Sequence, residues 1–244
     1  MNRFFYDLHI HSCLSPCADN DNTPNNLAGM ASISGLDIVA LTDHNSSKNC
    51  PAFFAAARKY GLIPIAGMEL TTSEDIHVVC LFEELDSALS FDKKLDGYRL
   101  MIKNRPNIFG DQLILDENDE PVGIEDNLLP SATALSIEDV PDLVEKFGGI
   151  CYPAHIDRDA NGIIAILGTL PETPEFGIVE IRDKEKISDF SEKYSLSKKR
   201  IVISSDAHYL TDIRDGENYF DLDAKKTDEA EVRRQLFKLL RSKI

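Results

Sequence analysis

The chain has 244 residues, with 26 lysines and arginines against 42 aspartates and glutamates, a formal net charge of −16. This length fits one large domain or two small ones, and suffices for a sizeable core. The acidic balance argues against a nucleic acid or an anionic membrane as a partner held by charge attraction. It does not exclude an anionic substrate, because bound metal ions can invert the local potential. No apolar run approaches the roughly 20 residues of a membrane span.

The chain has five cysteines, an odd number, and their spacing is irregular, which is not typical of a disulfide framework. The chain also runs from Met1 straight into an expected strand, without an export signal. We therefore expect a cytoplasmic protein with reduced thiols. Cys13 and Cys17 are not followed by a second cysteine pair, so a structural four-cysteine zinc site is not expected. Cys80 and Cys151 lie in apolar runs and are expected in the core.

The first part of the chain alternates short apolar strands with helical patterns. Thr23 and Pro24 are typical of a helix N-cap and first turn, and Gly35 and Gly61 are typical helix ends. The expected elements are a strand at 4–11, a helix at 24–34, a strand at 37–41, a helix at 51–60, and strands at 62–66 and 76–82.

The middle of the chain breaks this rhythm. A mostly polar helical stretch at 85–103 is followed by a hairpin with strands 112–115 and 120–123 and a loop at 125–136. We interpret about 84–135 as an insertion that covers the site; a decorative surface elaboration is the equal alternative. The rhythm then resumes with a helix at 137–147, a strand at 150–152, a short helix at 163–167, strands at 178–181 and 201–204, and an amphipathic helix at 228–240.

This strand–helix–strand order, with polar residues at the strand ends, predicts an α/β barrel or a layered α/β fold. The sequence shows no internal repeat or flexible linker, so we predict a single domain over residues 1–244. It does not indicate an oligomeric state.

All six histidines fall at strand ends or beside apolar runs. His9 and His11 are two residues apart on an expected strand, so both imidazoles, with Asp7, are expected on one face. Asp206 and His208 repeat this spacing. Carboxyl ends of parallel strands are where α/β barrels keep their sites, so the pattern predicts a metal centre. The remaining candidates are His44 beside Asp43, Glu69 after a strand, His77 and His155.

Taken together, these motifs resemble those of the PHP family, the polymerase and histidinol phosphatase domains. They are His9-x-His11, Thr42-Asp43-His44, Gly67-Met68-Glu69, His77, His155 and Ser205-Asp206-Ala207-His208. The resemblance covers nearly the whole chain. It implies a distorted, TIM-like (β/α)7 barrel, here with an inserted hairpin and helix region, and two to three divalent metal ions at the carboxyl ends of the strands.

The resemblance also implies which residues hold each ion. The first metal would take His9, His11, Glu69 and Asp206, and the second would share Glu69 and add His77 and His155. The third would take His44, His208 and a ligand from the loop after the first strand.

That loop ligand is usually His or Asp in the family, and this loop contains no histidine. Asp19 and Cys17 are the candidates. Aspartate would suit Mn²⁺ or Fe²⁺, whereas cysteine would favour Zn²⁺. The mixed set of histidines and carboxylates is compatible with zinc, manganese or iron.

Phosphoester hydrolysis follows from such a centre, because two ions sharing Glu69 would activate a bridging hydroxide. Arg158, three residues after His155, and Arg182, after an expected strand, are candidates for binding phosphate. Asp43 or Asp7 would orient ligand histidines. His208 or a metal-bound water would protonate the leaving group.

The predicted function is a metal-dependent phosphoesterase acting on a small phosphorylated metabolite or nucleotide. The alternatives are an amidohydrolase-like metal enzyme and a non-catalytic metal-binding regulatory module. Amidohydrolase barrels usually carry a metal-bridging lysine, and no lysine stands at a clear strand end.

Overall fold

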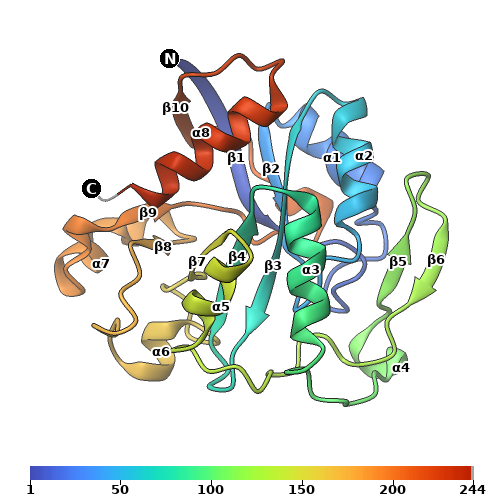
Figure 1. Cartoon of the computed structure of the whole chain (residues 1–244), viewed down its shortest axis with the longest axis horizontal. Helices are drawn as coiled ribbons and strands as arrows, with labels where there is room; N and C mark the ends of the chain where they lie inside the picture. The colour runs from blue at the N-terminus through green and yellow to red at the C-terminus, as the bar shows by residue number, and fades with distance from the viewer. Residues whose placement is uncertain (243–244) are drawn as a thin grey trace.

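The computed structural model describes residues 1–242 as a mixed α/β fold built on a curled sheet (Figure 1). Six strands form the main sheet in the order β10-β1-β2-β3-β4-β7, and β8 pairs with β9. The strands are β1 Asn2–Ile10, β2 Ile38–Leu41, β3 Ile63–Thr71, β4 His77–Phe82, β7 Gly149–Pro153, β8 Ile178–Glu180, β9 Arg200–Val202 and β10 Tyr219–Leu222.

Strand direction departs from a regular barrel repeat. β1, β2 and β3 are parallel, but β4 runs antiparallel to both β3 and β7, and β10 lies antiparallel on the outer edge of β1. The residues after β9 return to β1 through a parallel bridge between Ile10 and Ala207. The sheet therefore curls in a TIM-like manner. A regular (β/α)7 repeat is not confirmed, because β3 and β4 are joined directly, without a helix.

Helices cover the outside of this sheet, and α1 and α2 pack against each other. The predicted cap of α1 is confirmed, since the Thr23 side chain accepts from the Asn26 amide. The helices are α1 Pro24–Ile33, α2 Cys50–Lys59, α3 Leu85–Leu95, α4 Pro106–Phe109, α5 Val140–Lys146, α6 Ile163–Leu167, α7 Ile187–Lys193 and α8 Glu229–Arg241. Among residues 1–242, no helix has the length and apolar character needed to cross a membrane.

Two apolar cores lie on opposite sides of the sheet. The inner core holds Phe4, Tyr6 and Leu8 of β1 together with residues from β2, β3, β4 and β7. Helix α8 contributes Val232 and Phe237 to this core. The outer core packs the sheet against α1, α2, α3 and α5. The inner core thus lies beneath the strand ends that carry the histidines.

The segment at 84–135 is not confirmed as an insertion. Helix α3 ends at Leu95 rather than near 103 and packs on β3 and β4, as a helix of the main layer does. The hairpin of β5 Leu113–Leu115 and β6 Pro121–Ile124 lies at the periphery (Figure 1). Its Leu113 amide donates to the Cys13 carbonyl, and its Asp119 carboxylate accepts from Asn25. The hairpin therefore braces the loop after β1.

Candidate metal centre

Glu69, near the end of β3, lies at the middle of the histidine cluster. Its buried carboxylate lies within 3.4 Å of a ring nitrogen of five histidines. The shortest contacts are to His77 at 2.8 Å and to His44 and His155, each at 3.0 Å. The five histidines are His9, His11, His44, His77 and His155. The fold thus brings four separate segments to one carboxylate.

An irregularity in β1 aims its two histidines. The register between β1 and β2 shifts between Asp7 and Ile10. Every second side chain of β1 up to Leu8 enters the inner core, so regular alternation would place Ile10 there as well. Ile10 instead belongs to the outer core. Such a bulge re-aims the residues that follow it. His9 and His11 consequently share the site, with their Nε2 atoms 3.2 Å apart, while Asp7 does not join them.

His77 reaches the site from the opposite strand direction. It is the first residue of β4 and pairs with Thr71 at the end of β3. Because the two strands are antiparallel, the start of β4 lies at the same edge as the end of β3. This explains how a histidine at a strand start joins ligands that follow strand ends.

Asp206, His208 and His155 complete the cluster from the loops after β9 and β7. The Asp206 Oδ1 atom lies 3.3 Å from His11 Nε2 and 3.5 Å from His9 Nε2. The backbone of Asp206 has φ 53° and that of His155 has φ 26°, a region that residues other than glycine rarely occupy. Such strain is characteristic of functional sites. The rings of His208 and His11 are 4.3 Å apart.

The electrostatics of the cluster are strongly coupled. Burial raises the pKa of Glu69, but His77, His9 and His44 outweigh it and hold this pKa well below its usual range. Burial, with His208 and His44 nearby, lowers the pKa of His11 well below its ordinary value. A carboxylate that stays ionised and an imidazole that stays neutral are the forms that bind metal ions.

Several buried polar atoms here lack a hydrogen-bond partner within the described chain. They are Glu69 Oε2, Asp206 Oδ1, His44 Nδ1 and His155 Nδ1. Buried polar groups are normally satisfied, so these atoms indicate a missing ligand such as a cation. Three groups hold ligand atoms within 4.8 Å of one another: His9, His11, Glu69 and Asp206; His44, Glu69 and His77; and His11, His44 and His208. The residues therefore fit divalent metal ions.

The grouping modifies the ligand sets expected from the sequence. The first set is the one expected for the first metal. In the second, His44 joins Glu69 and His77, while His155 contacts Glu69 without entering that group. In the third, His11 joins His44 and His208. The assignment of each ligand to an ion stays a prediction.

Glu180 is a buried carboxylate that the sequence analysis missed. It lies on β8 and is fully buried. Its Oε1 atom lies 2.9 Å from His9 Nδ1 and accepts from the His155 amide at 3.0 Å. An acceptor on Nδ1 leaves Nε2 for a metal and fixes the ring. The available signal was a glutamate within the apolar run Ile178-Val179-Glu180-Ile181.

Asp43 supports the site through the loop after β1. It accepts from the Ser12 amide and from the Ser15 hydroxyl, each at 2.7 Å. The Ser15 Oγ atom lies 3.0 Å from His11 Nδ1. Hydrogen bonds therefore link Asp43 to His11 through Ser15, and the orienting role expected for Asp43 stays a prediction. Asp7 has another role: its carboxylate accepts from the amides of His9 and Ser205 and so ties β1 to the loop after β9.

The two candidates for the loop ligand, Cys17 and Asp19, are both exposed, and neither belongs to the three groups. Burial raises the pKa of the Cys17 thiol, but His208 and His44 outweigh it and lower the pKa to about 6. Asp19 accepts from the Asp21 amide at 2.8 Å. The identity of the loop ligand stays a prediction, with the electrostatics of His208 and His44 favouring a thiolate at Cys17.

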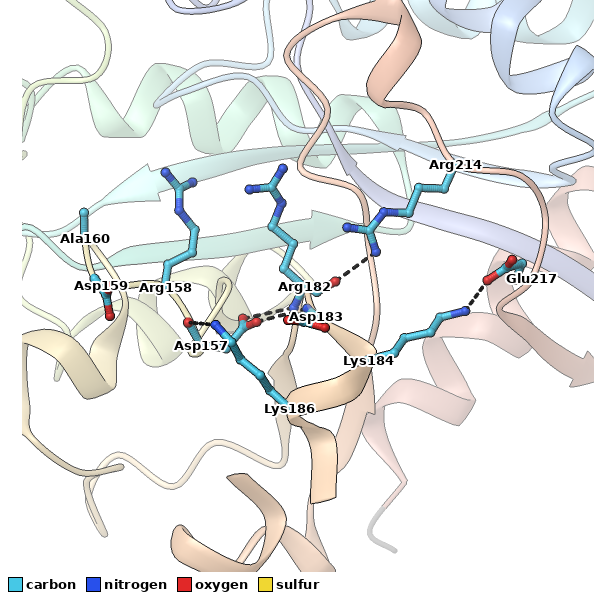
Figure 2. Close-up of a pocket in the computed structure, with 10 residues that line it drawn as sticks. All are labelled: Asp157, Arg158, Asp159, Ala160, Arg182, Asp183, Lys184, Lys186, Arg214 and Glu217. Atoms are coloured by element: carbon cyan, nitrogen blue, oxygen red, sulfur yellow. Dashed lines mark hydrogen bonds and ion pairs between the residues drawn. The ribbon is translucent and has the colours of Figure 1, made fainter. Parts of the chain in front are cut away.

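Arg158 and Arg182 border the centre. Arg158 Nη1 donates to Asp206 Oδ2 at 2.8 Å, rather than pairing with Asp157 or Asp159. Arg182 Nε donates to the Ser205 carbonyl and lies 3.9 Å from Asp206 Oδ2. Both arginines line a pocket of about 730 Å³, in which their guanidinium groups point the same way (Figure 2). The predicted phosphate-binding arginines thus lie beside the predicted metal ligands.

A comparison with protein families matches the PHP domain over residues 7–161, which is more than half of the chain. The chain belongs to the PHP domain family. The resemblance drawn from the motifs is therefore confirmed. This PHP-family protein has clusters of His, Asp and Glu side chains suited to binding metal ions.

Curated relatives match parts of this PHP-family chain. An error-prone DNA polymerase of Symbiobacterium thermophilum is 35% identical over 77 residues, 32% of this chain and 7% of the polymerase. A 5′-3′ exoribonuclease of Haemophilus influenzae is 33% identical over 91 residues, 36% of this chain and 29% of that protein. This chain therefore matches less than a third of the length of either relative.

Solved structures share the fold over nearly the whole chain. Endonuclease Q of Pyrococcus furiosus, a lesion-specific endonuclease, superposes with a TM-score of 0.66 at 18% identity. The match covers 98% of this chain and 56% of the endonuclease chain. A Bifidobacterium adolescentis protein assigned to the metal-dependent phosphoesterases has a TM-score of 0.56 at 17% identity, with 95% of both chains covered.

These comparisons correct the prediction that a nucleic-acid partner is unlikely. Endonuclease Q is also known in complex with a 27-mer duplex that places an abasic lesion at its active site, and one relative is an exoribonuclease. The prediction was wrong because a net charge of −16 describes the whole surface. The potential at a site depends on local groups, and basic side chains gather beside Asp206.

Proposed function

We propose that this protein is a metal-dependent phosphodiesterase that cleaves the backbone of a nucleic acid. The contact between Arg158 and Asp206 carries the proposal, since it places a guanidinium beside the cluster of candidate metal ligands. A guanidinium fork matches the geometry of a phosphate. The nucleases among the compared proteins support a phosphodiester substrate.

His9, His11, Glu69 and Asp206 would hold one ion, and His44 with His77 or His155 would extend the site around Glu69. Bound divalent ions would activate water as a nucleophile at neutral pH and neutralise charge on the phosphate. The ring of His208, with a side chain 22% exposed, would donate a proton to the leaving oxygen.

Arg158 and Arg182 would hold the non-bridging oxygens of the scissile phosphate. Asp43, through Ser15, would keep His11 oriented. Glu180 would hold His9 and the turn that carries His155. These hydrogen bonds preorganise the site, so that little rearrangement is needed when charge develops on the phosphate.

The test is turnover by purified protein reconstituted with Mn²⁺ or Zn²⁺. Substrates are bis(p-nitrophenyl) phosphate, p-nitrophenyl phosphate, single-stranded DNA and RNA oligonucleotides, and a duplex with an abasic site. We expect cleavage of the diester and of at least one nucleic acid, and loss of both in Glu69→Gln. Turnover of the monoester alone, or of no substrate with metal bound, would refute the proposal.

A further inference from the structure

The pocket beside Asp206 extends well beyond the two arginines at the metal centre. Its lining also includes Lys184, Lys186 and Arg214, from the segments after β8 and before β10. Five basic side chains therefore gather in one pocket of a chain with a net charge of −16. A volume of about 730 Å³ is larger than a single phosphate group requires.

Most acidic residues of the pocket are already engaged. The Asp157 carboxylate accepts from the amides of Arg182 and Asp183, and the Asp183 carboxylate accepts from the Glu185 amide. Glu217 pairs with Lys184 at 2.5 Å, and Asp159 lies exposed at the rim. These carboxylates shape the loops around the pocket.

Two cations of the pocket are fixed by carbonyl groups rather than by carboxylates. Arg214 Nη1 donates to the Arg182 carbonyl at 2.8 Å, and Lys186 Nζ donates to the Asp157 carbonyl at 3.1 Å. Neither side chain forms an ion pair within 4.0 Å among residues 1–242. A carbonyl holds a cation in place without neutralising it, so both retain charge for an anion.

The arginines form a row that starts at the metal centre. Figure 2 shows Arg158, Arg182 and Arg214 in sequence across the pocket, with Lys184 and Glu217 beyond Arg214. Arg158 contacts Asp206, Arg182 lies next to it, and Arg214 is anchored on the backbone of Arg182. A row of guanidinium groups therefore continues outward from the position expected for the scissile phosphate.

We infer that Arg214, supported by Lys186, forms a second phosphate subsite that binds the phosphate next to the scissile one. This inference rests on the proposed function and narrows its substrate to a strand with at least two consecutive phosphates. A substrate with a single phosphate would fill only the part of the pocket next to Asp206.

The test compares two substrates in the metal-reconstituted protein: bis(p-nitrophenyl) phosphate, with one phosphate, and a single-stranded thymidine hexanucleotide. We expect Arg214→Gln to lower kcat/KM for the hexanucleotide about tenfold, because a charge-assisted phosphate contact is lost. The value for bis(p-nitrophenyl) phosphate stays within about twofold. Arg234→Gln, which removes the same charge from an exposed position on α8, changes neither value.

Binding provides a second measurement that needs no turnover. Fluorescence anisotropy of a labelled hexanucleotide, measured in EDTA over a range of salt concentrations, gives the affinity and its salt slope. We expect Arg214→Gln to reduce this slope by about 0.7, the value for one phosphate contact on a single strand. A slope and affinity equal to those of the wild type would overturn the subsite.

The two proposals fail in different ways. If the diester is cleaved but Arg214→Gln affects both substrates equally, or does not affect the hexanucleotide, the subsite is wrong and the phosphodiesterase assignment stands. If neither substrate is cleaved while Arg214→Gln still weakens binding, the proposed chemistry is wrong and the subsite stands.

Discussion

Replacing Glu180 by glutamine tests whether a buried carboxylate behind the ligands sets metal affinity. Glutamine retains an oxygen that can accept from His9 Nδ1 and from the His155 amide, where Glu180 Oε1 accepts at 2.9 and 3.0 Å. It removes the negative charge. Burial lowers the pKa of His9, but Glu180, followed by Glu69 and Asp206, outweighs it and raises this pKa well above its usual value.

The expected loss can be worked out from these contacts. Mutating a partner behind a metal ligand typically costs about 10–100-fold in affinity. Glu180→Gln keeps both hydrogen bonds, so we expect a loss near tenfold, about 1.4 kcal/mol. Glu180→Ala leaves two buried N–H groups without an acceptor, at about 1–3 kcal/mol each. We therefore expect it to lose about 100-fold or more in affinity and to unfold at a lower temperature.

The assay is competition with a chromogenic chelator for Zn²⁺ or Mn²⁺, with thermal unfolding in EDTA measured alongside. Glu192→Gln on α7, outside both apolar cores and the metal centre, is the matched control. Equal affinity in Glu180→Gln and wild type would refute a role for the charge. Equal affinity in Glu180→Ala, with the fold intact, would refute the positioning role altogether.

Three further outcomes are expected. Glu69→Gln should lower the metal content measured by mass spectrometry, because five histidines contact this carboxylate; unchanged stoichiometry would contradict its central place. Cys17→Asp should shift metal preference from Zn²⁺ towards Mn²⁺ when both ions are offered in equal amounts, whereas Asp19→Asn should leave the preference unchanged. A shift in Asp19→Asn and none in Cys17→Asp would make Asp19 the ligand. Hydrogen bonding by Arg58, aided by Arg233, lowers the pKa of Glu229 in the folded protein. The ionised Glu229 therefore stabilises the fold above about pH 4.5, the ordinary pKa of the group, and this stabilisation is lost as the pH falls through the pKa of the folded state. Urea unfolding of Glu229→Gln should show a smaller loss of stability over that acid range, and an acid limb identical to the wild type would contradict this.

Local patterns predicted most of the elements, because each has its own signal. The cap at Thr23, the apolar runs of β2 and β4 and the periodicity of α8 all depend on neighbouring residues. The antiparallel direction of β4 and the pairing of β10 with β1 depend on contacts between distant segments. Local periodicity does not encode strand direction, so the barrel expected from the rhythm was more regular than the fold.

The site was predictable where ligand chemistry is visible in the sequence. Histidines after apolar runs marked the cluster around Glu69. Glu180 was missed because a single glutamate in an apolar strand resembles a break in the strand pattern. The choice between Cys17 and Asp19 depends on the path of the loop, which hydrogen bonds to Asp43 and to the hairpin hold, and it stays a prediction. Net charge misled because it averages over the whole surface, whereas five basic side chains line the pocket beside the site.

The position of β1 between β2 and β10 has a consequence for the order of folding. The strand that carries His9 and His11 receives contacts from Ser204 and Ser205, 196 and 198 positions away along the chain. Contacts of such sequence separation are slow to form because a long loop must close first. His9 and His11, which are synthesised first, therefore cannot form the complete site until the segment with Asp206 and His208 has joined β1. Metal uptake during refolding should lag behind the formation of helices, so it would report the final closure of the sheet.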